Sequence, residues 1–275
     1  MKNLLKSTFV TLLPTVALII LIRTLILFQL NNKTISLLLS SIPIVLFFSL
    51  LFIKPVARTS PNLIGYTTPM FIGFFFALYT KDITTIIASA ILVLGWLTYL
   101  FWYSKFEKRN THIIQVGKTL PELIFDTSDK EETSITDYQS DFKVLLFYRG
   151  NWCPLCMAQI KEIANEYKEL TKRNTEVFLI SSQPHHFTES LAKKHNVPFH
   201  FLVDIENKNA DKLQLLHKNG LPMGFQVLGY ESDVVLPTVI ITDKTNKIIY
   251  ADLTDNYRVR PEPATFLKII DEHIS

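Results

Sequence analysis

The stretch KVLLFYRGNWCPLCMAQI (residues 143–160) decides the fold of the second half of this 275-residue chain. Its first seven residues predict a continuous strand of the kind that is buried on both faces of a sheet. From residue 160 onward, apolar side chains recur at helical spacing and predict an amphipathic helix to about Arg173. The two cysteines, Cys153 and Cys156, therefore lie between the end of a buried strand and the start of a helix. Open α/β sheets keep ligands and catalytic groups at that edge.

The residues after this helix continue the alternation of strands and helices. We expect strands at EVFLIS (176–181), FHFLVD (199–204), PTVIITD (237–243) and KIIYADL (247–253). The short turn between the last two predicts a hairpin. We expect helices over about 187–195 and 209–217, and a last one that begins after Pro261 or Pro263 and ends near His273. This order predicts an α/β domain over residues 111–275, with a mixed sheet and helices on both faces.

Residues 1–110 differ, because four long apolar stretches fill them. The stretches run roughly over 9–30, 35–53, 63–79 and 83–103. Each is long enough, or nearly so, to cross a hydrocarbon core of about 30 Å at about 1.5 Å per residue. No small-residue cleavage site follows the first stretch, which excludes a cleaved signal peptide. We therefore expect an all-α membrane domain of about four transmembrane helices, with the lipid bilayer as its partner.

The apolar stretches lack the residues that transport or electron relay needs. None has a cysteine or an acidic residue in its apolar core, and the first histidine of the chain is His112. A dithiol relay needs cysteines, haem ligation normally needs histidine, and proton paths usually use carboxylates. The membrane domain is therefore expected to be an anchor.

Charge differs sharply between the two halves. Residues 1–110 carry a net +8 and the remaining residues −5, which together give the +3 of the whole chain. The acidic second half offers no basic stripe for a phosphate backbone, so we expect no nucleic-acid partner.

The basic residues of the first half also predict an orientation. The N-terminus, the second loop and the segment after the fourth stretch carry seven lysines and arginines, against two in the first and third loops. The positive-inside rule then predicts an integral protein of the plasma (inner) membrane with both ends in the cytoplasm. If the short third stretch does not cross, the number of crossings is odd and the second half lies outside.

A Cys-x-x-Cys pair at a helix N-terminus has a defined redox chemistry. Free amides and the positive end of the helix dipole stabilise a thiolate at the first position. Cys153 would then attack a disulfide, and Cys156 would resolve the mixed disulfide by forming the intramolecular bond. Pro154 suits a helix start. Trp152 would cover the pair with an apolar surface on which a partner docks.

Other roles for the pair meet specific obstacles. A zinc site requires about four ligands, and His185 and His186, expected in a surface loop, lie outside common spacings. A c-type haem site requires histidine directly after the second cysteine, where this chain has Met157. Two inert core cysteines are the structural alternative. We therefore expect no metal. We also expect no cofactor, because no phosphate-binding glycine loop is present to hold a nucleotide. The electron donor is then expected to be a protein or a small thiol.

Several motifs carry a resemblance to a known family. The WCPLC motif (152–156) and Leu236-Pro237-Thr238 before a later strand resemble the thioredoxin fold, in which the proline is cis and faces the cysteines. We expect a cis bond before Pro237. VGKTLP (116–121), FYRGNWCP (147–154) and DNYRVRPEP (255–263) resemble the alkyl hydroperoxide reductase/thiol-specific antioxidant (redoxin, peroxiredoxin-like) family. The resemblance covers roughly residues 111–275 and says nothing about the apolar stretches.

The resemblance leaves two chemistries open. Family peroxidases carry Pro-x-x-x-Thr/Ser-x-x-Cys, in which the last cysteine attacks peroxide. Aligned on the strand, Cys156 takes the peroxidatic place, Cys153 replaces Thr/Ser, and Arg149 stands where the first proline would be. Leu236 falls where the family supplies an arginine that stabilises the peroxidatic thiolate. A thiol is a poor hydrogen-bond partner for peroxide. Two elements that support peroxide reduction in the family are therefore changed or missing, the Thr/Ser at position 153 and the arginine at position 236.

The leading hypothesis is therefore a membrane-anchored thiol–disulfide oxidoreductase in which Cys153 attacks and Cys156 resolves. One alternative is a peroxiredoxin-like peroxidase with Cys156 peroxidatic and Cys153 resolving through a sulfenic acid. Another is a redox-sensing or binding module. Substrates are disulfides or peroxides. The supporting residues of the candidate site are Trp152, Pro154, Arg149, Pro237 and Thr238.

Overall fold

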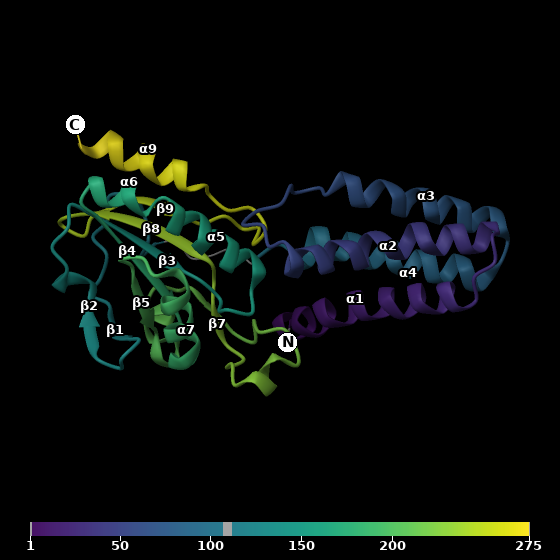
Figure 1. Cartoon of the computed structure of the whole chain (residues 1–275), viewed down its shortest axis with the longest axis horizontal. Coiled ribbons are helices and arrows are strands. Elements are labelled where there is room, and N and C mark those ends of the chain that lie inside the picture. The colour runs from purple at the N-terminus through teal and green to yellow at the C-terminus, as the bar shows by residue number, and fades with distance from the viewer. Residues whose placement is uncertain (1, 107–111, 275) are drawn as a thin grey trace. The chain divides into compact units, whose positions relative to one another are not determined.

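The structure is a computed structural model that describes residues 2–106 and 112–274 (Figure 1). The chain divides into two compact units. The helical unit consists of Met1–Pro55 and Thr59–Lys105, and the α/β unit of Val56–Arg58 and Phe106–Ser275. The expected boundary at residues 110 and 111, and three residues of the charge count, Glu107, Lys108 and Arg109, lie outside the described residues.

Each of the four apolar stretches is a helix of the helical unit. They are α1 (Lys2–Ile26), α2 (Asn32–Ile53), α3 (Ile64–Thr80) and α4 (Ile83–Thr98), which a π-helical turn at Tyr99–Tyr103 extends. Three of them, α1, α2 and the extended α4, are long and apolar enough to cross a membrane, judged by length and composition alone. With 17 residues, α3 is roughly 26 Å long, slightly short of a hydrocarbon core.

Close packing joins α3 to the neighbouring helices of this unit. A Cβ on Gly73 of α3 would lie 2.7 Å from Ser40 Oγ of α2, so only glycine permits this approach. Ser36 Oγ donates to the Gly73 carbonyl at 2.9 Å and lies 3.1 Å from Ser89 Oγ of α4. Small residues and interhelical hydrogen bonds of this kind hold helices together in apolar surroundings. Within the helical unit, α3 runs alongside α2 (Figure 1).

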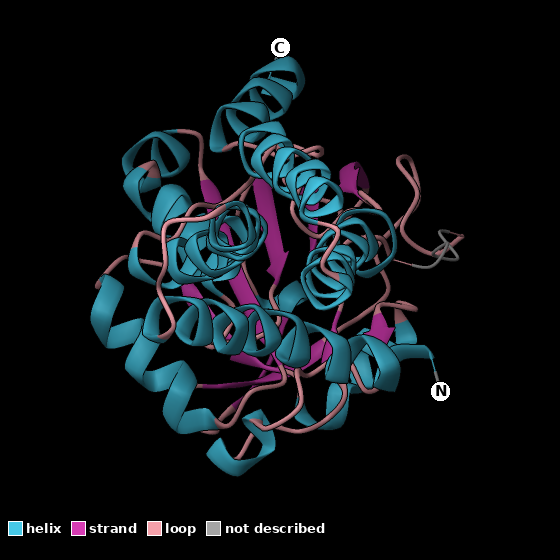
Figure 2. Cartoon of the chain, turned by 90° about the vertical axis from the view of Figure 1, so that its right-hand side faces the viewer, coloured by secondary structure: helices cyan, strands magenta, loops and turns pink. Residues whose placement is uncertain are grey.

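The α/β unit is built on a seven-stranded mixed sheet, whose strands are magenta in Figure 2. The strands are β1 (Ile124–Thr127), β2 (Glu132–Ser134), β3 (Phe142–Phe147), β4 (Thr175–Ser181), β5 (His200–Val203), β8 (Thr238–Asp243) and β9 (Ile248–Asp252). Their order is β2-β1-β5-β4-β3-β8-β9. The three strands β3, β4 and β5 are parallel, whereas β8 and β9 form the expected antiparallel hairpin. This is a thioredoxin-like fold, as the sequence predicted.

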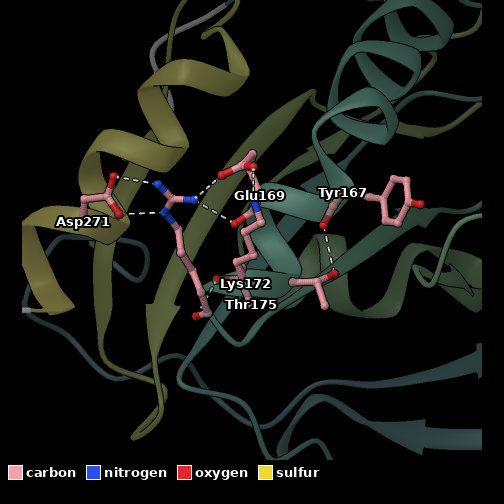
Figure 3. A network of polar contacts seen from close by, with 7 residues as sticks. Tyr167, Glu169, Lys172, Thr175 and Asp271 are labelled. Carbon is pink, nitrogen blue, oxygen red and sulfur yellow. Dashed lines mark hydrogen bonds and ion pairs between the residues drawn. The ribbon is translucent and has the colours of Figure 1, made fainter.

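Helices cover both faces of this sheet. They are α5 (Pro154–Asn165), α6 (Tyr167–Lys172), α7 (His185–His195), the short α8 (Lys208–Lys212) and α9 (Pro263–Ile274). In Figure 1, α5, α6 and α9 lie on one face and α7 on the other. Arg173, just after α6, bonds Asp271 of α9 at 2.6 and 3.0 Å and also contacts Glu169, in the network of Figure 3. These ion pairs tie two helices of the same face together.

Two helices are shorter than the sequence predicted. The helix expected to continue to Arg173 breaks at Glu166, which separates α5 from α6. The helix expected over 209–217 ends at Lys212, and Leu216–His217 instead form β6, which pairs with β7 (Val234–Val235). The cause is tertiary: the carbonyl of Leu215 accepts a hydrogen bond from the Leu236 amide at 2.7 Å, so the chain is extended there.

Candidate active site

A sharp turn after β3 carries the chain into the helix of the cysteines. Gly150 has φ +142°, and a Cβ there would lie 2.8 Å from Trp152 Nε1, so this position needs glycine. The Cys153 amide donates to the Gly150 carbonyl at 3.1 Å and closes the turn. Cys153 is then the N-cap of α5 and Pro154 its first residue, as the sequence predicted for a helix start.

A buried glutamine fixes this turn from the end of β4. Gln183 Nε2 donates to Tyr148 Oη at 3.0 Å, and its Oε1 accepts the amide hydrogen of Asn151 at 2.8 Å. The Asn151 side chain in turn donates to the carbonyl of Phe187 in α7 at 2.9 Å. The residues between β3 and α5 are therefore anchored to a second strand and to a helix of the other face.

The two sulfurs are reduced and buried, with a guanidinium beside one of them. Cys153 is 2% exposed and Cys156 is fully buried. Arg260 Nη1 and Nη2 each lie 3.5 Å from Cys156 Sγ. Arg260 is held by Gln159 Oε1, which accepts from Nη1 at 2.8 Å, and by the Tyr257 carbonyl, which accepts from Nε at 3.0 Å. The guanidinium thus presents both of its terminal nitrogens to a single sulfur.

This arrangement favours a negative charge on Cys156. Burial alone would raise the pKa of Cys156, but the hydrogen bond from Cys153, the charge of Arg260 and the main-chain N–H of Arg149 together lower it to about 5. Burial raises the pKa of Cys153, and its hydrogen bond to Cys156 raises it further. The two pKa shifts run in opposite directions and favour the anion on Cys156, with the Cys153 thiol as its hydrogen-bond donor.

The lowered pKa of Cys156 favours the sequence alternative in which Cys156 attacks and Cys153 resolves over the leading sequence hypothesis. That hypothesis put the thiolate at the first position of the motif, on the strength of the helix dipole. The dipole acts on both cysteines, whereas Arg260 and the Arg149 amide act chiefly on Cys156. A full charge at hydrogen-bonding distance outweighs a partial one.

Arg149 and Trp152 lie against each other next to the pair. The Arg149 guanidinium stacks on the Trp152 ring at 4.6 Å from its centroid, and Nη2 donates to the Gly220 carbonyl. Trp152 also contacts the Phe225 ring, with centroids 5.7 Å apart. Arg149 thus acts on the thiolate mainly through its own main-chain N–H, while its side chain holds Trp152 in place.

Pro237 and Thr238 belong to the surroundings of Arg260. With Gln159 and Arg260 they line a cavity of about 10 Å³, roughly the size of one water molecule. The expected cis bond before Pro237 is wrong: the bond is trans. Thr238 Oγ1 donates to the Leu236 carbonyl at 3.0 Å, and the chain enters β8 extended, which the more stable isomer allows.

Arg260 is the main residue that the sequence analysis missed. The sequence analysis found Leu236 in the place of the family arginine and named Arg149 as the candidate guanidinium, whereas the structure places Arg260 against Cys156. The signal was present in DNYRVRPEP (255–263), which was used only as a family signature. Its two arginines, Arg258 and Arg260, are candidate counter-ions for a thiolate.

The adjacent histidines lie outside the site. His185 and His186 begin α7 instead of forming a surface loop, because Pro184 provides the N-cap, and His185 Nε2 lies 3.2 Å from Asp126 Oδ2. Within residues 2–106 and 112–274, no group of three or more His, Cys, Asp or Glu side chains could hold a metal ion.

Replacement of Arg260 tests the origin of the thiolate. In a Cys153→Ser background, which keeps a hydroxyl donor, the pKa of Cys156 should stay below that of an ordinary thiol. Adding Arg260→Gln should move the titration upward, toward the value of about 8.5 of an ordinary thiol. The ultraviolet absorbance of the thiolate across pH measures both, with circular dichroism as the control for folding. Identical titrations in the two variants would contradict the assignment.

Part of the α/β unit is similar in sequence to known proteins. The model of the AhpC/TSA family matches residues 116–251. Peroxiredoxin Bcp of Bacillus subtilis is 25% identical over 138 residues, which are 50% of this chain and 83% of that protein. A peroxiredoxin of Ignicoccus hospitalis is 29% identical over 111 residues, which span 38% of this chain and only 47% of that relative.

Solved structures include similar chains. Peroxidoxin BcpB from Mycobacterium tuberculosis has a TM-score of 0.47 and 15% identity, over 57% of this chain and 97% of its own. AhpC of Enterococcus faecalis has a TM-score of 0.48 and 13% identity, over 58% of this chain and 92% of its own. From the family match and the relatives, residues 116–251 are an AhpC/TSA family domain, a peroxiredoxin-like member of the thiol oxidoreductase enzymes.

Proposed function

We propose that this protein is a membrane-anchored thiol peroxidase in which Cys156 attacks the peroxide and Cys153 resolves the product. The observation that carries the proposal is the paired contact of Arg260 with Cys156 Sγ, at 3.5 Å from each terminal nitrogen. A peroxidatic sulfur must be a thiolate at neutral pH, and it benefits from a fixed positive group where charge develops. Cys156 has a lowered pKa and both terminal nitrogens of Arg260 beside it, whereas the pKa of Cys153 is raised.

The first step oxidises Cys156. Its thiolate attacks one oxygen of the peroxide, the S–O bond forms as the O–O bond breaks, and Cys156 becomes a sulfenic acid. The leaving alkoxide or hydroxide takes up a proton and departs as an alcohol or water. The Arg260 guanidinium, held by Gln159 and Tyr257, keeps its N–H groups directed at the reacting sulfur and stabilises the charge that moves to oxygen.

The second step uses Cys153. Its sulfur attacks the sulfenic sulfur, the disulfide forms, and the hydroxyl group leaves as water after taking a proton. Cys153 already donates a hydrogen bond to Cys156, so the two sulfurs are neighbours before the reaction. The Cys156 charge is one cause of the raised Cys153 pKa, and the first step removes it. A protein or small-thiol donor then returns two electrons to the disulfide.

Cysteine variants of the full chain in detergent test the division of roles. Mixed with hydrogen peroxide after full reduction, Cys156→Ser should lose fast thiol oxidation altogether. Cys153→Ser should keep a fast first turnover and then accumulate sulfenic acid, because the resolving thiol is absent. Stopped-flow measurement of peroxide consumption and mass spectrometry of the product check these outcomes. Fast oxidation that depends on Cys153 alone would overturn the proposal.

A second candidate, thiol–disulfide exchange, has one observation in its favour. The CPLC motif lies at a helix N-terminus, with Cys153 as the N-cap, which also suits a dithiol reductase. The same variants distinguish the two functions. Reduction of protein disulfides that requires Cys153, together with peroxide oxidation no faster than that of an ordinary thiol, favours the reductase.

The oxidised form should be looser around Arg260. Disulfide formation removes the anion from a guanidinium that is only 6% exposed and leaves it the neutral Gln159 and Tyr257 groups. A buried charge without a counter-charge is costly. Amides of residues 253–262 should therefore exchange hydrogen faster in the oxidised than in the reduced protein, as measured by mass spectrometry. Amides of α9 near Asp271 serve as the control, and equal exchange of 253–262 in both states would contradict this expectation.

The membrane orientation is also part of the proposal: the α/β unit faces the cytoplasm and the helical unit crosses the inner membrane. The seven-to-two distribution of basic residues supports it. So does the path of the chain, because Val56–Arg58 lie between α2 and α3 yet belong to the α/β unit. An even number of crossings between Arg58 and Phe106 keeps both parts of that unit on one side. This favours α3 crossing together with α4.

Cysteines introduced into the connections test this orientation. Ser60→Cys, between α2 and α3, should react with a membrane-impermeant maleimide only after cells are broken. Lys81→Cys, between α3 and α4, should react in intact cells, since the two native cysteines are buried. Labelling of both positions from the same side would mean that α3 does not cross.

A further inference from the structure

Arg58 of the α/β unit joins the two pieces of chain that form the reacting centre. Its Nε donates to the Arg260 carbonyl at 3.1 Å, and Nη2 lies 3.4 Å from the Pro261 carbonyl. Nη1 lies 3.4 Å from Glu162 Oε1, and Nη2 contacts Glu162 Oε2. One guanidinium therefore contacts both the backbone that carries Arg260 and the helix that carries Cys156.

The segment that carries Arg260 needs such a support. Residues 253–262 connect β9 to α9 without a helix or strand of their own. The Phe106 amide donates to the Asp255 carbonyl at the start of this segment. Around Arg260 the main-chain hydrogen bonds are short-range, such as that from the Val259 amide to the Asn256 carbonyl at 3.0 Å. Arg58 adds bonds to two consecutive carbonyls from a residue that is about 200 positions away in the chain. A planar guanidinium with several donors suits this task better than an ammonium.

The contacts of Arg58 contribute more to the position of the Arg260 backbone than to the free energy of unfolding. The side chains of Arg58 and Glu162 are 27% and 37% exposed, and partly exposed ion pairs add little to the free energy of unfolding. Glu262 is a weaker partner, 3.6 Å from Nη1 and largely exposed. What Arg58 can fix is the position of the Arg260 backbone relative to α5, on which the two 3.5 Å contacts with Cys156 depend.

We propose that Arg58 is a positioning residue that holds Arg260 against Cys156 by clamping the 260–261 carbonyls to Glu162 of α5. The inference rests on the proposed function, because it assigns Arg260 the stabilisation of a reacting Cys156. It gives the connection between α2 and α3 a role in the chemistry of the α/β unit. The redox centre then includes a residue from the amino-terminal part of the chain, outside the family match of 116–251.

Arg173 provides a matched control. It too is a partly exposed arginine, at 21%, that ties two elements together through a carboxylate, here α9 through Asp271 (Figure 3). Its contacts involve neither Cys156 nor Arg260. Arg173→Gln should therefore cost similar stability without affecting the thiolate.

The experiment compares Arg58→Gln, Arg58→Lys, Arg173→Gln and Arg260→Gln with the parent, as full chains in detergent. Arg58→Gln should lower the second-order rate constant for hydrogen peroxide about tenfold, as small misplacements of catalytic groups do. It should also raise the pKa of Cys156, read from thiolate absorbance. Arg58→Lys, which keeps the charge and some donors, should give intermediate values. Arg173→Gln should leave both quantities unchanged.

Two outcomes contradict the proposal in distinguishable ways. If Arg58→Gln behaves like Arg173→Gln while Arg260→Gln slows peroxide reduction, Arg58 has no positioning role and the proposed function stands. If Arg260→Gln is also without effect, the proposed role of the Cys156 centre fails, and this inference fails with it. Thermal unfolding of each variant separates loss of positioning from loss of fold.

Discussion

The contact between Arg260 and the buried Cys156 thiolate is the constraint on which the rest of the α/β unit depends. Charges taken out of water cost several kcal/mol each unless they are paired with good geometry and further hydrogen bonds. The thiolate has a paired guanidinium, the Arg149 amide and the Cys153 thiol, and the guanidinium has Gln159 and a carbonyl. These donors come from the end of β3, the N-cap of α5 and the segment after β9. Two distant parts of the sequence, the turn from β3 into α5 and the segment after β9, must therefore meet within hydrogen-bonding distance.

Strand register explains how they meet. β3 pairs antiparallel with β8, and β8 antiparallel with β9, so β3 and β9 run in the same direction. Phe147, the last residue of β3, is opposite Thr238, and the next residue of β8 is opposite Asp252, the last residue of β9. Both strands thus end at the same edge of the sheet. The turn through Gly150 brings the cysteines to that edge, and the segment after Asp252 brings Arg260.

The same register explains what could be predicted from sequence and what could not. Local patterns gave the strands at 142–147, 175–181 and 238–243 and the two cysteines, because apolar runs and a helix-start proline are visible within a few residues. The short β1 and β2, with four and three residues, carry no such period and were missed. Arg260 was missed because the family arginine was expected at Leu236, just before β8, whereas the guanidinium belongs to the segment that follows β9. Which cysteine carries the charge depends on that non-local contact and could not follow from the helix dipole alone.

Two departures from the family pattern are each compensated by another residue or by a second role. Cys153 replaces the hydroxyl residue of family peroxidases, and its thiol donates to the Cys156 thiolate, so a donor is kept at that position. The Cys153 sulfur also lies where the resolving sulfur of the proposed function must lie. One side chain therefore serves as both the hydrogen-bond donor and the resolving thiol. The loss of the arginine at Leu236 is offset by Arg260, which reaches the sulfur from a different strand end. A guanidinium carried on an irregular segment needs support from another part of the chain, and Arg58 gives that support through the carbonyls of residues 260 and 261. The further the counter-ion lies from the regular sheet, the more its position depends on such a residue.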